Sequence, residues 1–222
     1  IQWNAMFEGM EGIIEHLPYM MSCGNHDTRG IYAEALERYC PTANGRSYYT
    51  FRMGSLWGIV LDCGEDKRDT NNEYGGTICF HPFRLCETEY IQQIIENAER
   101  EYAADGVTHK LVISHIPFTH INEFPFDIEQ ELYAEWTQLM RDYIKPDLLL
   151  YGHYHTTEIV RPGDHFDSHG QPCNAVIGSK PIFDKENGNG FIGCALTLME
   201  NGKKRVVFND NKGVIYTDEV ID

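Results

Sequence analysis

Apolar residues recur at helical spacing at the start of the chain: Trp3, Phe7, Met10, Ile14 and Leu17. This spacing predicts an amphipathic helix that ends at Pro18. A short apolar strand is expected at 19–22, and a short helix at 31–39. Residues 47–53 and 56–62 alternate around a Gly-Ser turn and predict a β-hairpin.

The second half of the chain alternates buried strands with helices. After a loop-like stretch at 63–87, Thr88 is expected to cap a helix whose apolar face ends at Tyr102. Apolar runs at 110–114 and 147–151 read as buried strands, and helical spacing lies between them. Short strands follow at 156–160, 173–177, 191–199, 205–208 and 214–217. This order predicts an α/β fold in which two layered sheets form a sandwich flanked by helices.

Composition and charge narrow the possible partners. The formal net charge of −16 disfavours binding to a nucleic-acid backbone. No apolar run approaches the length of a membrane span, so no membrane partner is expected. The seven cysteines are scattered and form no C-x-x-C pair, which favours reduced thiols. Reduced thiols favour the cytoplasm, but an export signal upstream of Ile1 would reverse this, so the localisation stays open.

Three polar motifs follow three of the predicted apolar strands: Asn25-His26-Asp27, Ser114-His115 and His153-Tyr154-His155. Ligands of open α/β sheets bind at the carboxyl ends of strands, so these motifs are expected to converge. Imidazole nitrogen and amide oxygen are competent ligands for divalent transition metals. The sequence therefore predicts a metal site formed by Asn25, His115 and the histidine pair.

These motifs carry a resemblance to a known family. Gly24-Asn25-His26-Asp27 resembles the G-N-H-[DE] box of the calcineurin-like metallophosphoesterases. Ser114-His115-Ile116-Pro117 is similar to that family's strand-terminal histidine, and Gly152-His153-Tyr154-His155 to its closing G-H-x-H. The resemblance implies a two-sheet α/β sandwich, and a hydrolase that cuts phosphate mono- or diesters at a dinuclear metal centre by a metal-activated hydroxide.

The resemblance also implies a role for each residue of the motifs. Asn25, His115 and His153 would bind one metal ion, and His155 would bind the other. His26 would act on the scissile phosphate, as a general acid or a stabiliser of charge. Asp27 would hold the orientation of His26 through a hydrogen bond.

Two motifs of the family, Asp-x-His and Gly-Asp, are absent upstream of Asn25. We therefore interpret residues 1–222 as the C-terminal part of a single metallophosphoesterase domain, incomplete at its N-terminus. Two dications about 3.5–4 Å apart need bridging anionic oxygen, and the four retained ligands are neutral. By itself the chain is expected to hold at most one metal ion weakly and to be close to inactive. The missing segment, or another chain, is expected to cover an open sheet edge.

Several alternatives stay open. A non-catalytic binding or scaffold protein could keep this fold without the dinuclear site, although the retained His26-Asp27 pair favours catalysis. His120 and Arg29 could contact substrate phosphate, or could be ordinary surface residues. The polar segment 164–169 reads as a solvated loop. The native metal, which the resemblance limits to Mn, Fe or Zn, and the identity of the ester are not determined by the sequence.

Overall fold

The computed structural model describes residues 2–29, 33–184, 186 and 188–222 and has two β-sheets. The first sheet has six strands in the order β1-β2-β3-β4-β6-β5. Their bounds are Tyr49–Met53 (β1), Leu56–Leu61 (β2), His109–Ser114 (β3), Leu148–Tyr151 (β4), Ala175–Ile177 (β6) and Glu158–Val160 (β5). The second sheet has four strands in the order β10-β9-β8-β7. Their bounds are Ile215–Ile221 (β10), Lys204–Asp210 (β9), Gly190–Leu198 (β8) and Lys180–Ile182 (β7).

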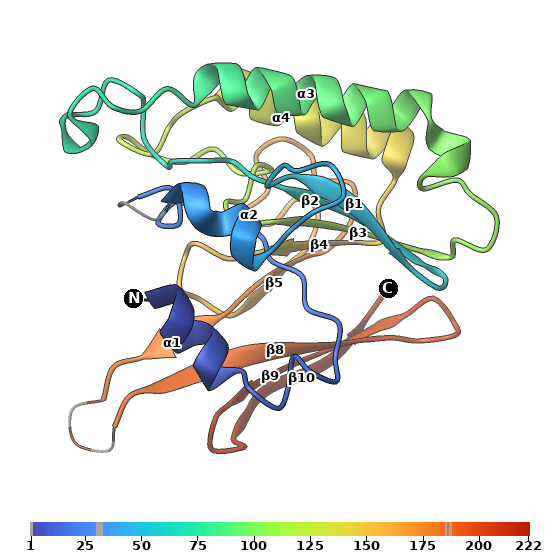
Figure 1. The fold of residues 1–222 in the computed structure, drawn as a ribbon. Coiled ribbons are helices and arrows are strands. Elements are labelled where there is room, and N and C mark those ends of the chain that lie inside the picture. Colours follow the sequence, from blue (N-terminus) through green and yellow to red (C-terminus); the bar gives the residue numbers. More distant parts are fainter. Residues whose placement is uncertain (1, 30–32, 185, 187) are drawn as a thin grey trace.

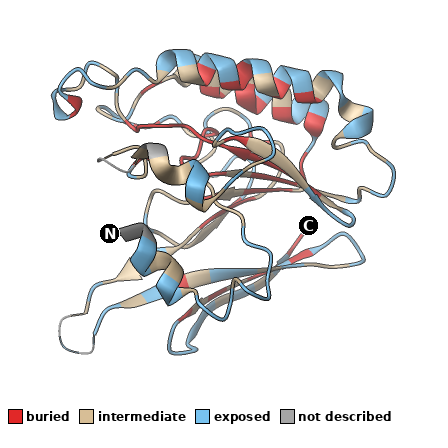
Figure 2. Ribbon diagram, in the orientation of Figure 1, coloured by how far each residue is buried: buried red, intermediate tan, exposed pale blue. Residues whose placement is uncertain are grey.

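Two helices cover one face of the six-stranded sheet, and the second sheet lies on its other face (Figure 1). These helices are α3 (His81–Glu96) and α4 (Gln130–Leu139), and α4 continues into a π-helical turn at Met140–Ile144. The buried face of α3 and the central strands form the most buried layer (Figure 2). The expected α/β sandwich flanked by helices is therefore confirmed.

Two hydrophobic cores hold these layers together. The larger core lies between the helices and the six-stranded sheet and includes Trp57, Ile91 and Trp136, all at most 1% exposed. The smaller core lies between the sheets, where Leu148 and Phe208 are buried. The six-stranded sheet is thus buried on both faces, which is why the centres of β3 and β4 read as continuous apolar runs.

The register of the parallel strands places three loops at one edge of the sheet. Strands β2, β3 and β4 are parallel neighbours, with Leu61 paired to Ser114 and Ser114 paired to Tyr151. These are the last residues of the three strands, so the segments that follow them begin side by side. The carboxyl edge of the sheet therefore collects His115, the Gly152-His153 turn and the segment that begins at Asp62.

The N-terminal elements differ from the prediction. Helix α1 (Gln2–Gly9) gives way to turns well before Pro18, and residues 19–22 form no strand. Tyr49 of β1 contacts this segment through its hydroxyl, which donates to the Met21 carbonyl at 2.9 Å, and no backbone ladder forms there. Of the helix expected at 31–39, positions 31 and 32 lie outside the described residues. The remainder is a 3-10 turn (Ala33–Ala35) followed by α2 (Leu36–Tyr39).

Helix α3 begins seven residues earlier than the predicted cap at Thr88. The carboxylate of Asp69 accepts hydrogen bonds from the backbone N–H groups of Phe80 and His81, at 3.1 and 3.3 Å. A side chain from a preceding loop therefore satisfies the free donors of the first turn. Thr88 lies inside the helix and bonds to the Arg84 carbonyl instead.

Other short elements complete the chain. 3-10 turns occur at Asn72–Tyr74 and Ala98–Arg100. The turn after Met199 joins β8 to β9, as its Asn-Gly pair predicts. All seven cysteines are free. None of the helices in the described part of the chain has the length and hydropathy needed to span a bilayer.

Candidate metal centre

The imidazole of His115 lies between two glycines at the carboxyl edge of the six-stranded sheet. A Cβ atom added to Gly24 would lie 3.0 Å from the His115 ring, and one added to Gly152 would also lie 3.0 Å from it. The Gly152 N–H donates to the His115 carbonyl at 3.0 Å, which ties the two loops together. Glycine at both positions thus permits the close approach of two loops to one histidine.

His153 lies beside His115 in an uncommon backbone conformation. The two ring centroids are 5.4 Å apart with the planes nearly perpendicular. His153 and His155 have φ angles of 68° and 50°, in the left-handed region that side-chain-bearing residues rarely adopt. Strain of this kind clusters at functional sites, because the surrounding structure must hold it in place.

Partial burial and mutual repulsion favour the neutral form of His115 and His153. Burial, and then the charge that His153 would carry when protonated, lowers the pKa of His115 to about 4. Burial likewise lowers the pKa of His153, although the nearby carboxylate of Asp66 acts in the opposite direction. Neutral imidazole is the form that binds a metal ion, so both side chains are in the ligand state at neutral pH.

Asn25 adds an amide oxygen whose hydrogen-bonding capacity is not used. The residue is 2% exposed, and its Nδ2 donates to Asp66 Oδ2 at 3.0 Å. Its Oδ1 atom is buried and has no hydrogen-bond partner. A buried oxygen without a partner is costly unless a cation or water meets it. The donors present, one amide oxygen and neutral imidazoles, therefore fit a divalent transition metal.

His26 and His155 are exposed neighbours of the partly buried His115 and His153. Both act electrostatically on His115 and on His153, which places the four histidines in one group. Among the described residues, no three His, Cys, Asp or Glu side chains are close enough together to hold a metal ion. The predicted set for one ion has a different composition, since it combines two imidazoles with the Asn25 amide.

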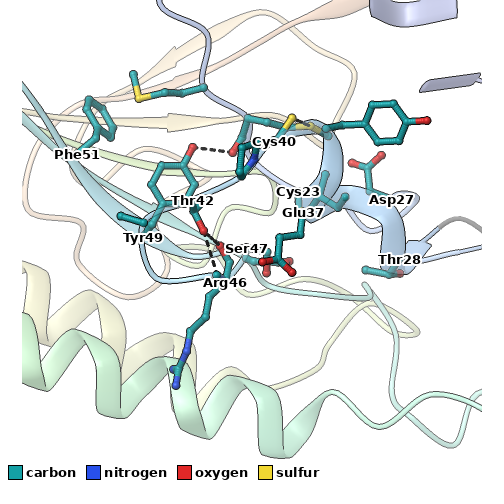
Figure 3. A pocket seen from close by; sticks show the side chains of 18 of the residues that line it. Cys23, Asp27, Thr28, Glu37, Cys40, Thr42, Arg46, Ser47, Tyr49 and Phe51 are labelled. Atoms are coloured by element: carbon teal, nitrogen blue, oxygen red, sulfur yellow. Dashed lines mark hydrogen bonds between the residues drawn. The ribbon is translucent and has the colours of Figure 1, made fainter. Parts of the chain in front are cut away.

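Asp27 has a partner other than the expected one. Its Oδ2 accepts a hydrogen bond from the Gly24 N–H at 2.9 Å, and no bond to His26 occurs within the described residues. Asp27 and Thr28 also line a cavity of about 670 Å³ together with Cys23, Cys40 and Tyr49 (Figure 3). Of the described residues that line this cavity, none is one of the four predicted metal ligands.

Sequence reasoning missed two carboxylates beside the site, Glu65 and Asp66. Glu65 is 0% exposed and receives two bonds of 2.7 Å from the Arg29 guanidinium. Burial alone would raise the pKa of Asp66, but the ammonium of Lys67, which lies 2.9 Å away, and the hydroxyl of Tyr74 hold it below its usual value. Both acids follow β2, so the strand-end rule that identified the histidines also applies to them.

Arg29 is engaged with protein carboxylates. Besides its two bonds to Glu65, it donates to Glu73 at 3.0 Å. His120 is the other residue, besides Arg29, considered for phosphate contact. Its ring packs on the rings of Tyr154 and Phe166, with centroid-to-centroid distances of 6.1 and 5.0 Å. The segment 164–169 contains a turn in which the Asp167 carboxylate accepts backbone N–H bonds from Gly163, Gly170 and Gln171.

The sequence matches no protein-family model and no curated protein. The chain is similar in structure to a purple acid phosphatase from yellow lupin (Lupinus luteus) seeds, with a TM-score of 0.59 and 16% identity. The match covers 100% of this chain and 43% of the lupin protein.

Two further solved structures are more distant. A protein described as a 5′-nucleotidase from Staphylococcus aureus has a TM-score of 0.42 and 16% identity, over 89% of this chain and 36% of that one. PhoD has a TM-score of 0.42 and 11% identity, over 94% of this chain and 48% of that one. The chain thus spans less than half the length of each solved structure. The lupin match shows that the chain shares its fold with part of that phosphatase.

Proposed function

We propose that this chain carries part of the active site of a metal-dependent phosphoester hydrolase. The observation that carries the proposal is the buried, unpartnered Oδ1 of Asn25. Asn25 follows Gly24, which approaches the His115 ring closely, and the His153 ring lies beside that of His115. The fold that the chain shares with a purple acid phosphatase supports the reaction class. Fold alone does not determine function, and the site adds a set of donors that suits a divalent metal ion.

Asn25, His115 and His153 would hold one divalent ion, and His155 would turn toward a second. A divalent ion bound there would supply electrophilic polarisation of a phosphoryl oxygen. A second ion beside it would need bridging anionic oxygen, which the four proposed ligands do not include. We therefore expect one ion to bind through Asn25, His115 and His153, and a dinuclear centre to require further carboxylates.

His26 is proposed to act on the leaving group. His26 is exposed, whereas Asn25 is buried and His115 is partly buried, so the imidazole of His26 is available to a bound ester. Within reach of the leaving oxygen, it would donate a proton as the ester bond breaks. Asp27 would then act on His26 through the turn that its bond to Gly24 stabilises.

Metal titration followed by a hydrolysis assay tests this proposal. Isothermal titration with Mn²⁺, Zn²⁺ and Fe²⁺ should show one equivalent bound, and His115→Ala should weaken it at least about 10-fold. His165→Ala is the matched control, because the side chain of His165 is 67% exposed and contacts Glu158 at 3.4 Å and the ring of Phe166, neither of which is a proposed ligand. Equal affinities for the two variants and the parent chain would contradict the proposed site.

Hydrolysis of an aryl phosphate monoester and of a bis-aryl phosphate diester should then be measured on the metal-loaded chain. Turnover that His26→Ala abolishes, without loss of metal affinity, supports the hydrolase and identifies the ester class. Metal binding without turnover of either ester, in this chain and in any longer form, favours the alternative of a non-catalytic binding protein.

A further inference from the structure

The side-chain amide of Asn25 has a defined orientation because its partner can only accept. A carboxylate has no proton to donate, so the group that faces Asp66 Oδ2 at 3.0 Å must be the Nδ2 of Asn25. The Oδ1 atom then faces the other way, where it is buried without a partner. Rotating the amide by half a turn would set two oxygens against each other and leave Nδ2 without an acceptor.

Asp66 is itself held in place by two other groups. Its Oδ1 accepts from the Lys67 ammonium at 2.9 Å and from the Tyr74 hydroxyl at 3.1 Å, which leaves Oδ2 for Asn25. Tyr74 is 7% exposed, and its hydroxyl also lies 3.1 Å from Glu65. The carboxylate is thus 7% exposed and is held through its Oδ1 by groups other than Asn25.

We infer that Asp66 is a positioning residue that presents the Asn25 Oδ1 atom to a divalent cation. The inference rests on the proposed function, which supplies the cation, and it adds a residue that the sequence motifs do not contain. The contact joins segments that are 41 residues apart, one following β2 and the other preceding the described helix α2. Without Asp66 the amide could rotate, and the oxygen would face the site for only part of the time.

Metal titration of two Asp66 variants and a control variant tests the inference. With Mn²⁺ and Zn²⁺ as probes, Asp66→Ala should weaken binding about 10- to 100-fold, as loss of a group that orients a ligand does. Asp66→Asn should weaken it less, because its Oδ1 can still accept from Asn25. Glu73→Ala is the control, since Glu73 contacts Lys67 and Arg29 in the same network. The metal affinity of the Glu73→Ala chain should stay within about twofold of that of the parent chain.

The double variant separates positioning from direct ligation. If Asp66 acts through Asn25, then N25A/D66A should bind metal as weakly as N25A alone, because the group being positioned is already gone. Losses that multiply in the double variant would mean that Asp66 meets the metal itself, and this would overturn the inference. Parent-like affinity of Asp66→Ala would overturn it as well.

A readout without metal makes the two proposals separable. In the metal-free chain, the Asn25 side-chain NH₂ should be protected from hydrogen exchange, and Asp66→Ala should remove that protection. Unchanged protection overturns the inference even if metal binds. If Asn25→Ala binds metal as well as the parent chain does, the proposed function fails, while the exchange measurement still decides the role of Asp66.

Discussion

Replacing Gly24 by alanine tests the close contact on which the candidate metal centre depends. The new Cβ would lie 3.0 Å from Cδ2 of His115 and 3.1 Å from both Cγ and Nε2. Carbon atoms in good contact are about 3.5–4.0 Å apart, so the imidazole would have to move by a few tenths of an ångström. The φ angle of Gly24 lies outside the left-handed region, so the effect comes from the contact and not from backbone strain.

The expected losses follow from packing and from ligand geometry. Inserting one methyl group into a packed interior typically costs about 1–3 kcal/mol of unfolding free energy. The imidazole has little room to escape, because the Gly152 backbone lies against its opposite side. Metal–ligand distances are tolerated only within about 0.2 Å of their usual values, so this shift should also lower metal affinity at least about 10-fold.

Urea unfolding and isothermal titration with Mn²⁺ measure the two effects on the same preparation. Gly193→Ala is the matched control, because a Cβ at this position of β8 would meet only Phe191, at an ordinary 3.7 Å. A Gly24→Ala chain that unfolds within about 0.5 kcal/mol of the parent would refute the packing argument. Unchanged metal affinity together with lowered stability would refute the place of His115 among the ligands.

Three further substitutions test other parts of the structure. Burial, and repulsion from a nearby buried carboxylate, raise the pKa of Glu87 well above its usual value, so the folded chain keeps a proton that the unfolded chain has lost. Stability should therefore fall by up to about 1.4 kcal/mol per pH unit as the pH rises from the usual glutamate pKa toward the folded one. In urea unfolding between pH 5 and 8, Glu87→Gln should flatten this slope, and parallel slopes would contradict the assignment. Gly64→Ala should lower the unfolding free energy by more than about 2 kcal/mol in thermal denaturation. The residue has a φ of +65°, and a Cβ there would lie 2.3 Å from the Phe80 ring. A loss below about 0.5 kcal/mol would argue against this conformation. Trp136→Phe removes a buried 2.7 Å hydrogen bond to Thr88 and should lower the unfolding free energy by about 1–3 kcal/mol, whereas an unchanged urea midpoint would show that this bond contributes nothing.

The sequence pattern was sufficient to predict those strands and turns whose burial is decided by local composition. Strands β3 and β4 are continuous apolar runs, and the structure has them within one residue of the predicted positions. The hairpin of β1 and β2 and the turn between β8 and β9 follow from glycine-containing turns that few other residues could form. The layered α/β architecture follows from the order of these elements.

Local pattern failed where an element depends on a distant partner. Residues 19–22 are apolar enough for a strand, but no strand in the described part of the chain pairs with them. Helix α3 starts at His81 because the carboxylate of Asp69 reaches its first turn from 11 residues upstream. A strand needs a neighbour and a cap needs an acceptor, and neither has to be near in sequence.

For the site, the sequence by itself identified Asn25, His115 and His153 as candidates, because each belongs to a motif expected to follow an apolar strand. Only the tertiary structure decided that the His115 ring lies between Gly24 and Gly152, that Asn25 Oδ1 is buried without a partner, and that Asp66 fixes its direction. The physical reason is register: pairing of Leu61 with Ser114, and of Ser114 with Tyr151, brings loops from separate parts of the chain to one edge. Periodicity can show that a strand is buried, but its neighbours depend on contacts that form only when the whole chain folds.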